Sequence, residues 1–237
     1  MIDLPIALHI PDGFLSGGVA AVCAVAAIAA VAYGLRVANV ELDEARVPLL
    51  GVLAAFIFAT QMLNFPIAGG TSGHLLGATL AAVLLGPWLA CLVLAVVLVV
   101  QAFAFADGGI SALGANILNM GVLGALLAGY LVVAAQKVLP HTRLVFLGIV
   151  GVVSWLAVMV GAAATSVELA ASGTVPLGTS LPAMLGVHSL IGIGEAVITV
   201  AAVSAVLVSR PDLVALAPEE LRQPAAPPFG RPVRGEA

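Results

Sequence analysis

Charged side chains are scarce in this chain. Only 8% of its 237 residues are Asp, Glu, Lys or Arg, whereas 62% are hydrophobic. A water-soluble domain carries about 25% charged residues, because charge covers the surface that faces water. Eight basic and twelve acidic residues cannot cover such a surface. The composition therefore excludes an ordinary soluble enzyme and predicts a protein whose main solvent is lipid.

Several binding patterns are missing as well. The chain has no basic cluster of the kind that binds nucleic acid, and it has no GxxxxGK[ST] phosphate loop, so ATP hydrolysis would need another protein. Its two cysteines, Cys23 and Cys91, lie in apolar segments without a CxxC spacing, which predicts small core residues. No Cys-rich or Met-rich cluster suits copper(I), and no carboxylate cage suits calcium or magnesium.

Seven apolar segments make up most of the chain. They predict an all-α fold, a polytopic membrane bundle of about seven transmembrane helices with a six-helix core plus one. The third segment is short for a spanning helix, and Pro87 is expected to end it and start the fourth. The predicted segments are roughly 17–35, 48–63, 74–86, 88–106, 114–135, 144–165 and 183–208.

The basic residues predict the orientation. Residues 47–136 and 144–209 contain no Lys or Arg, and with seven spans the three basic regions fall on one side. Positive residues mark the cytoplasmic side, so the N-terminus is expected outside and the C-terminus inside the cell membrane. The basic residues are Arg36 and Arg46, then Lys137 and Arg143, then Arg210, Arg222, Arg231 and Arg234.

Three parts are expected along the chain. Residues 1–8 form an N-terminal extension, residues 9–209 a transmembrane domain, and residues 210–237 a cytoplasmic tail. The tail is rich in proline and polar residues, which predicts disorder apart from a short helix near Pro218–Arg222.

Polar residues gather near the predicted outer side, where each is a candidate for function. His9, His74 and His188 lie there, and histidine is a frequent ligand of late first-row metals. Asn116 begins the fifth segment, one turn before Asn119, and interhelical hydrogen bonding is the simpler role for both.

Glu195 follows His188 by two helical turns and therefore shares its face. A carboxylate there would either orient the imidazole of a metal ligand or pair elsewhere within the bundle. His188 itself has a plain alternative as a hydrogen-bonded interfacial residue.

These landmarks resemble a known family. Residues 9–16 read His-Ile-Pro-Asp-Gly-Phe-Leu-Ser, which resembles the N-terminus of the CbiM/NikM family, the cobalt/nickel-binding membrane components of energy-coupling-factor transporters. Gly73-His74, the run from Gln101 to Asn119, and the run from His188 to Thr199 resemble the same family. Together these motifs extend over nearly all of the membrane portion of the chain.

The resemblance implies a planar four-nitrogen site. In the family, the terminal amine, the main-chain nitrogen and imidazole of the next residue, and a second histidine bind the ion. Here these positions match His9, which supplies two nitrogens, and His74. The expected substrates are Co²⁺ or Ni²⁺, because tetragonal nitrogen sites suit these ions better than zinc. No organic cofactor is expected.

The N-terminus departs from the family pattern. His9 follows Leu8 rather than an initiating Met, and residues 1–8 do not resemble a signal peptide. We expect translation to start at Leu8, from a leucine codon read as Met, so that the amine of residue 8 becomes a ligand.

The resemblance also implies partners: a coupling transmembrane protein, a pair of ATPase subunits and a small accessory membrane protein.

Two other functions fit parts of the sequence. Gly70-Thr71-Ser72-Gly73 matches the nucleophile turn of a rhomboid-type serine protease, with His188 as its base. A vitamin-binding subunit of the same transporter class would share the membrane architecture, although only 5% of the residues are aromatic.

Overall fold

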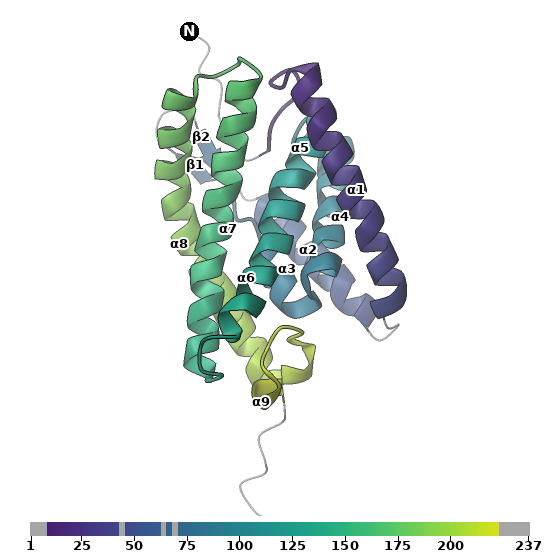
Figure 1. Cartoon of the computed structure of the whole chain (residues 1–237), viewed down its shortest axis with the longest axis vertical. Helices are drawn as coiled ribbons and strands as arrows, with labels where there is room; N and C mark the ends of the chain where they lie inside the picture. The colour runs from purple at the N-terminus through teal and green to yellow at the C-terminus, as the bar shows by residue number, and fades with distance from the viewer. Residues whose placement is uncertain (1–8, 43–45, 63–64, 68–70, 223–237) are drawn as a thin grey trace, which may run out of the picture.

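The protein is a bundle of long helices (Figure 1) in a computed structural model that describes residues 9–42, 46–62, 65–67 and 71–222. Two short strands, β1 (Phe65–Ile67) and β2 (Thr71–Gly73), pair antiparallel with Pro66 opposite Ser72. The helices in chain order are α1 (Gly17–Glu41), α2 (Val47–Gln61), α3 (Ala78–Leu85), α4 (Pro87–Phe105), α5 (Leu113–Asn116), the π-helix η2 (Ile117–Leu126), α6 (Leu127–Gln136), α7 (Arg143–Ala171), α8 (Leu177–Ser209), the 3₁₀ helix η3 (Pro211–Leu213) and α9 (Glu219–Arg222).

The prediction of an all-α membrane bundle is confirmed, and each of the predicted segments is helical over most of its length. Among the described residues, five helical stretches are long and apolar enough to cross a membrane: α1, α4, the continuous run 113–136, α7 and α8. The helix α2 has 15 residues and α3 only eight. All eight residues of α3 are buried, so this helix is packed inside the bundle.

Four helix boundaries differ from the prediction by several residues. The helix α1 ends at Glu41 rather than at residue 35, and α8 begins at Leu177 rather than at residue 183. The other two differences bear on polar residues. Residues 74–77 precede α3 as an irregular loop that ends at Gly77, whose φ is 71°. The helix α7 continues to Ala171, beyond the polar pair Thr165 and Ser166 where the sequence predicted its end. Both of these side chains are buried within the bundle.

The junction between α3 and α4 follows the prediction. Gly86 ends α3 with a φ of 89°, a left-handed conformation that glycine adopts without strain. Pro87 then starts α4, where its missing N–H costs no helical hydrogen bond.

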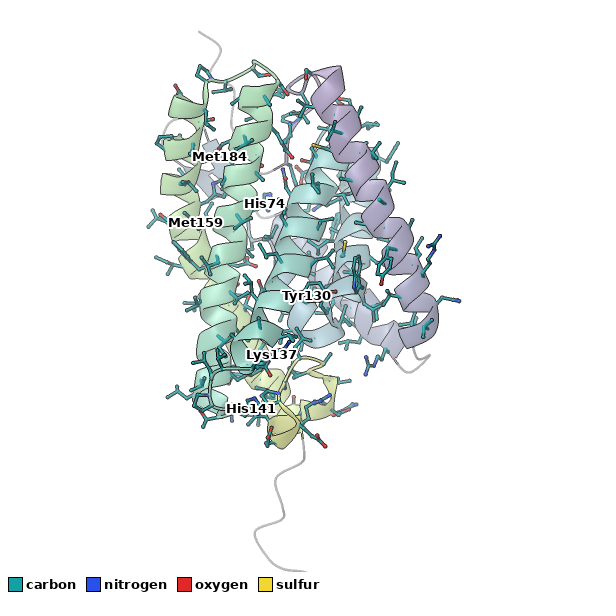
Figure 2. The ribbon with its side chains drawn as sticks, in the orientation of Figure 1. His74, Tyr130, Lys137, His141, Met159 and Met184 are labelled. Atoms are coloured by element: carbon teal, nitrogen blue, oxygen red, sulfur yellow. The ribbon has the colours of Figure 1, made fainter. Side chains whose placement is uncertain are left out.

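The helix ends that border the basic regions gather at one end of the bundle (Figure 1). The C-terminal ends of α1, α6 and α8, the N-terminal end of α7 and the whole of α9 lie there. Figure 2 shows Lys137 and His141 at this end, whereas His74 lies in the opposite half of the bundle.

The segment after α8 contacts the C-terminal end of α3. The N–H groups of Ala215 and Leu216 donate to the carbonyls of Leu84 and Val83 at 3.4 and 3.0 Å. These bonds satisfy carbonyls that the short helix leaves without partners at its C-terminus. The helix α9 lies where a short helix was predicted, and the part of the tail before it contains η3 and the bonds to α3. Residues 223–237 of the predicted tail and the N-terminal extension fall outside the described residues.

Candidate metal site

Two histidines from distant parts of the sequence meet inside the bundle. His9 precedes α1 and His74 follows β2, yet their ring centroids lie 4.3 Å apart with the planes tilted by 33°. The residues are only 4% and 1% exposed. Figure 2 shows His74 in the interior, behind α7 in that view. The structure therefore brings together the two histidines that the sequence singled out.

The imidazole of His74 has one nitrogen free. Its Nδ1 lies 2.9 Å from the carbonyl of Leu75, which can only accept, so Nδ1 carries the proton. Its Nε2 is buried and has no hydrogen-bond partner. Burial, with the neighbouring His9 acting in the same direction, lowers the pKa of His74 to about 3. The ring is therefore neutral at physiological pH, which is the state that binds a metal ion.

His9 lies against a carboxylate. Its Nδ1 is 3.1 Å from Oδ1 of Asp107, in the loop between α4 and α5, although the two groups are not aligned as a hydrogen bond. Burial acts to raise the pKa of Asp107, but the His9 imidazole outweighs burial and holds this pKa below its ordinary value. Nothing local to Asp107 in the sequence indicates that its side chain meets residue 9.

The backbone after His9 is held at several points. The side chain of Asn116 accepts from the N–H of Ile10 at 2.9 Å and donates to its carbonyl at 3.2 Å. The N–H of Gly109 donates to the same carbonyl at 2.8 Å. The Asp12 carboxylate accepts from the N–H and hydroxyl of Ser111, and the pKa of Asp12 lies below its ordinary value chiefly because of that hydroxyl.

Gly109 is a position where a side chain cannot fit. A Cβ there would lie 2.3 Å from the backbone nitrogen of Asp12. We expect Gly109→Ala to displace the segment that holds His9 and to lower nickel affinity about 10- to 100-fold, measured by isothermal titration of the purified protein. Gly148→Ala, where a Cβ would meet open space, is the matched control. Equal affinity in the two variants would contradict this account of the segment.

The loop that contains His74 is held from α8. The two carboxylate oxygens of Glu195 accept from the N–H groups of Leu76 and Gly77 at 2.8 and 2.7 Å. The carbonyl of Leu76 accepts from Gln61 of α2 at 2.8 Å, and Gln61 in turn accepts from Gln101 of α4 at 3.0 Å. A buried polar network thus fixes the backbone that immediately follows His74.

His188 and Glu195 have different partners. The Nδ1 of His188 lies 2.8 Å from the carbonyl of Met184, one turn earlier in α8, and its buried Nε2 has no partner. The described contacts of Glu195 are with the loop backbone rather than with this imidazole. His188 nevertheless lies close enough to His74 for its charge to contribute to the lowered pKa of His74.

The two asparagines of the fifth segment also differ. Asn116 contacts the backbone beside His9, as described above. Asn119 makes the interhelical contacts that are the simpler role for such residues, with Thr165 at 3.2 Å and Glu168 at 2.8 Å. Their one-turn spacing did not separate these two functions, because the difference lies in which segment faces each residue.

Two residues to which the sequence analysis gave a role, Leu8 as a metal ligand and Ser72 as a protease nucleophile, cannot be placed in the site. Leu8 lies outside the described residues, and so does the side chain of Ser72, whose backbone is in β2. Among the residues that are described, no three His, Cys, Asp or Glu side chains form a ready metal-binding group.

Comparisons with known proteins show the family of the chain. The sequence profile of CbiM, the cobalt uptake substrate-specific transmembrane region, matches residues 9–213. The fused nickel transport protein NikMN of Rhodobacter capsulatus is 36% identical over 236 residues, covering 93% of this chain and 66% of that protein. The cobalt transport protein CbiM of Sorangium cellulosum is 32% identical over 214 residues, covering 87% of this chain and 94% of that one.

A solved structure agrees as well. A crystal structure of a transition metal transporter matches with a TM-score of 0.75 and 33% sequence identity, covering 84% of this chain and 92% of the other. The family predicted from the sequence motifs is thus confirmed. Because the profile spans most of its length, the chain belongs to the CbiM family of cobalt uptake substrate-specific transmembrane proteins.

Proposed function

We propose that this protein is the substrate-specific subunit of an energy-coupling-factor importer, and that it captures Ni²⁺ or Co²⁺ at the outer membrane face. The observation that supports the proposal most is the pair of buried imidazoles of His9 and His74, 4.3 Å apart, with unpartnered ring nitrogens. Similar proteins are named for nickel and cobalt transport. The chain itself is a transport subunit and not an enzyme.

Four nitrogens hold the ion in this proposal. His9 supplies its main-chain nitrogen and imidazole, His74 supplies Nε2, and the amine of residue 8 supplies the fourth when translation starts there. A plane of nitrogens suits Ni²⁺ and Co²⁺ better than Zn²⁺, which prefers a tetrahedron. The negative charge of Asp107, 3.1 Å from His9, offsets part of the charge of the bound dication.

The distribution of charge supports the proposed direction of transport. The basic regions border helix ends at one end of the bundle, and His74 lies in the opposite half (Figures 1 and 2). Because basic residues favour the cytoplasmic side, the capture site faces outward and the ion moves inward across the cell membrane.

Energy for the movement comes from partners in this proposal. The sequence has no phosphate-binding loop for ATP. We infer that a coupling transmembrane protein and a pair of ATPase subunits act at the cytoplasmic end, and that a small accessory membrane protein joins them. The fused architecture named for the Rhodobacter capsulatus relative, which is longer than this chain, is consistent with a further membrane component.

The proposed ligand at residue 8 has its own test. Mass spectrometry of the protein isolated from its native cells is expected to show an N-terminal Met at position 8, followed by His9. An intact Met1-Ile2 start would remove the amine from the ligand set. In that case, protein initiated artificially at position 8 would bind nickel more tightly than the full chain, because only it has the free amine.

The function as a whole is tested by metal uptake. Cells that produce this chain with its partner subunits are expected to accumulate radioactive nickel or cobalt above the level of cells that lack the chain. Uptake equal to that of cells without the chain, from protein shown to be in the membrane, would refute the proposal.

A further inference from the structure

A second polar cluster lies inside the bundle and plays no part in the site described above. Its centre is Glu168 of α7, a carboxylate that is 8% exposed within a membrane-length helix. Within the described ranges, no Lys, Arg or His forms an ion pair with it. A carboxylate in such surroundings is costly without a compensating charge and is a candidate functional group.

The partners of this carboxylate come from two other helices. The thiol of Cys23 in α1 donates to Oε1 at 3.5 Å, and the amide of Asn119 in η2 donates to Oε2 at 2.8 Å. The sixth apolar segment was predicted to end at residue 165, which left Glu168 outside the membrane helix. Cys23 lies alone in an apolar segment, so the sequence did not indicate a binding role for it. Only the packing of η2 against both α7 and α1 brings these groups together.

The distance between sulfur and oxygen fits one bound ion. Thiolate and carboxylate ligands lie about 2.3 Å and about 2.0–2.2 Å from a late first-row ion, and tetrahedral geometry places two such ligands about 3.5 Å apart. The Sγ of Cys23 and Oε1 of Glu168 are separated by 3.5 Å. An ion could therefore replace the thiol proton between them with little movement of either side chain.

Asn119 adds an oxygen without a partner. The residue is 0% exposed, its Nδ2 is shared between Thr165 and Glu168, and its Oδ1 makes no hydrogen bond. The same amide group donates to Glu168, so an acceptor without a partner belongs to a side chain that contacts this carboxylate. Buried acceptors without a partner are uncommon and call for an explanation.

We propose that Cys23, Glu168 and Asn119 form a second binding site for a divalent transition-metal ion. The identity of the ion as Co²⁺ or Ni²⁺ rests on the proposed function. Binding releases the thiol proton to water, so the thiolate and the carboxylate together neutralise the dication. The sulfur ligand favours late transition metals over Ca²⁺ and Mg²⁺.

One buried apolar cluster contains neighbours of both sites. Ile10, which follows His9, packs in one buried cluster with Cys23 and with Leu169, the neighbour of Glu168. The two sites therefore border the same buried apolar cluster.

Cobalt(II) absorption tests this site, because a thiolate ligand gives an intense near-ultraviolet charge-transfer band that nitrogen and oxygen ligands do not. The full chain, purified in detergent as the His74→Ala variant, is titrated with cobalt(II) alone. We expect the band to appear, to disappear in Cys23→Ser and Cys23→Ala, and to persist in Cys91→Ser. Cys91 is an equally buried cysteine of α4, which makes it the matched control. Glu168→Gln should weaken cobalt binding about tenfold or more.

Several outcomes would overturn the site. These are the absence of the band at saturating cobalt, its survival in both Cys23 variants, or its loss in Cys91→Ser. Retained nickel binding at the His9–His74 site, measured in the Cys23 variants with His74 intact, shows that these proteins are folded. An error in the proposed His9–His74 site would give a different result from an error in the second site. It would appear as equal nickel binding with and without the His74 substitution.

Discussion

The His74→Ala protein is expected to bind nickel or cobalt at least about 100-fold more weakly than the unchanged protein, since it loses a directly bound nitrogen. His74 has one ring nitrogen fixed to the Leu75 carbonyl and the other buried without a partner. Removal of the ring leaves no other described imidazole in ring contact with His9. Metal content after purification, measured by inductively coupled plasma mass spectrometry, checks this expectation.

Two control variants make the result specific. His141→Ala removes an exposed histidine at the opposite end of the bundle, where it contacts Gln136 and Glu220 (Figure 2), and metal content should not change. Ser72→Ala should also retain metal and uptake, whereas the serine-protease alternative makes Ser72 essential. Equal metal in His74→Ala and the unchanged protein would contradict the site.

The second large effect is expected at Glu195. Its carboxylate accepts from the N–H groups of Leu76 and Gly77, and Glu195→Ala would leave both donors buried without partners. Each buried donor left without a partner costs about 1–3 kcal/mol, so the free energy of unfolding should fall by about 2 kcal/mol or more. Because the same loop holds His74, nickel affinity should fall about 10- to 100-fold. Chemical denaturation and nickel titration measure the two quantities.

A pair of variants separates loop positioning from general destabilisation. Glu195→Gln keeps one side-chain oxygen as an acceptor, so it should bind nickel more tightly than Glu195→Ala. Glu219→Ala, an exposed change in α9, should leave both stability and affinity unchanged. The positioning role of Glu195 is wrong if the alanine variant is destabilised yet binds nickel with unchanged affinity.

The fold was largely predictable because lipid as a solvent imposes a simple rule on the sequence. Long apolar runs become helices, and the helix ends that border the described basic residues lie at one end of the bundle. The short third segment was the exception. Its first four residues, 74–77, form a loop because Gly77 adopts a left-handed conformation and Glu195 satisfies the loop's N–H groups, and both conditions depend on tertiary contacts.

The candidate site was predictable only in part. Family motifs identified His9 and His74. The contact of Asp107 with His9 joins residues about 100 positions apart, and the contact of Gln61 with Leu76 joins residues 15 positions apart in different segments. No local pattern reports such pairs. Glu195 was singled out for its depth in the membrane and its spacing from His188, yet its partners are backbone groups of another segment.

The central claim is that His9 and His74 hold a nickel or cobalt ion in a plane of nitrogen ligands. X-ray absorption at the nickel K edge, on purified protein whose translation starts at residue 8, tests this claim most directly. The account predicts the pre-edge feature of a planar complex and a single shell of four nitrogen neighbours. A spectrum of six-coordinate nickel surrounded by oxygen, in protein that retains His74, would contradict it.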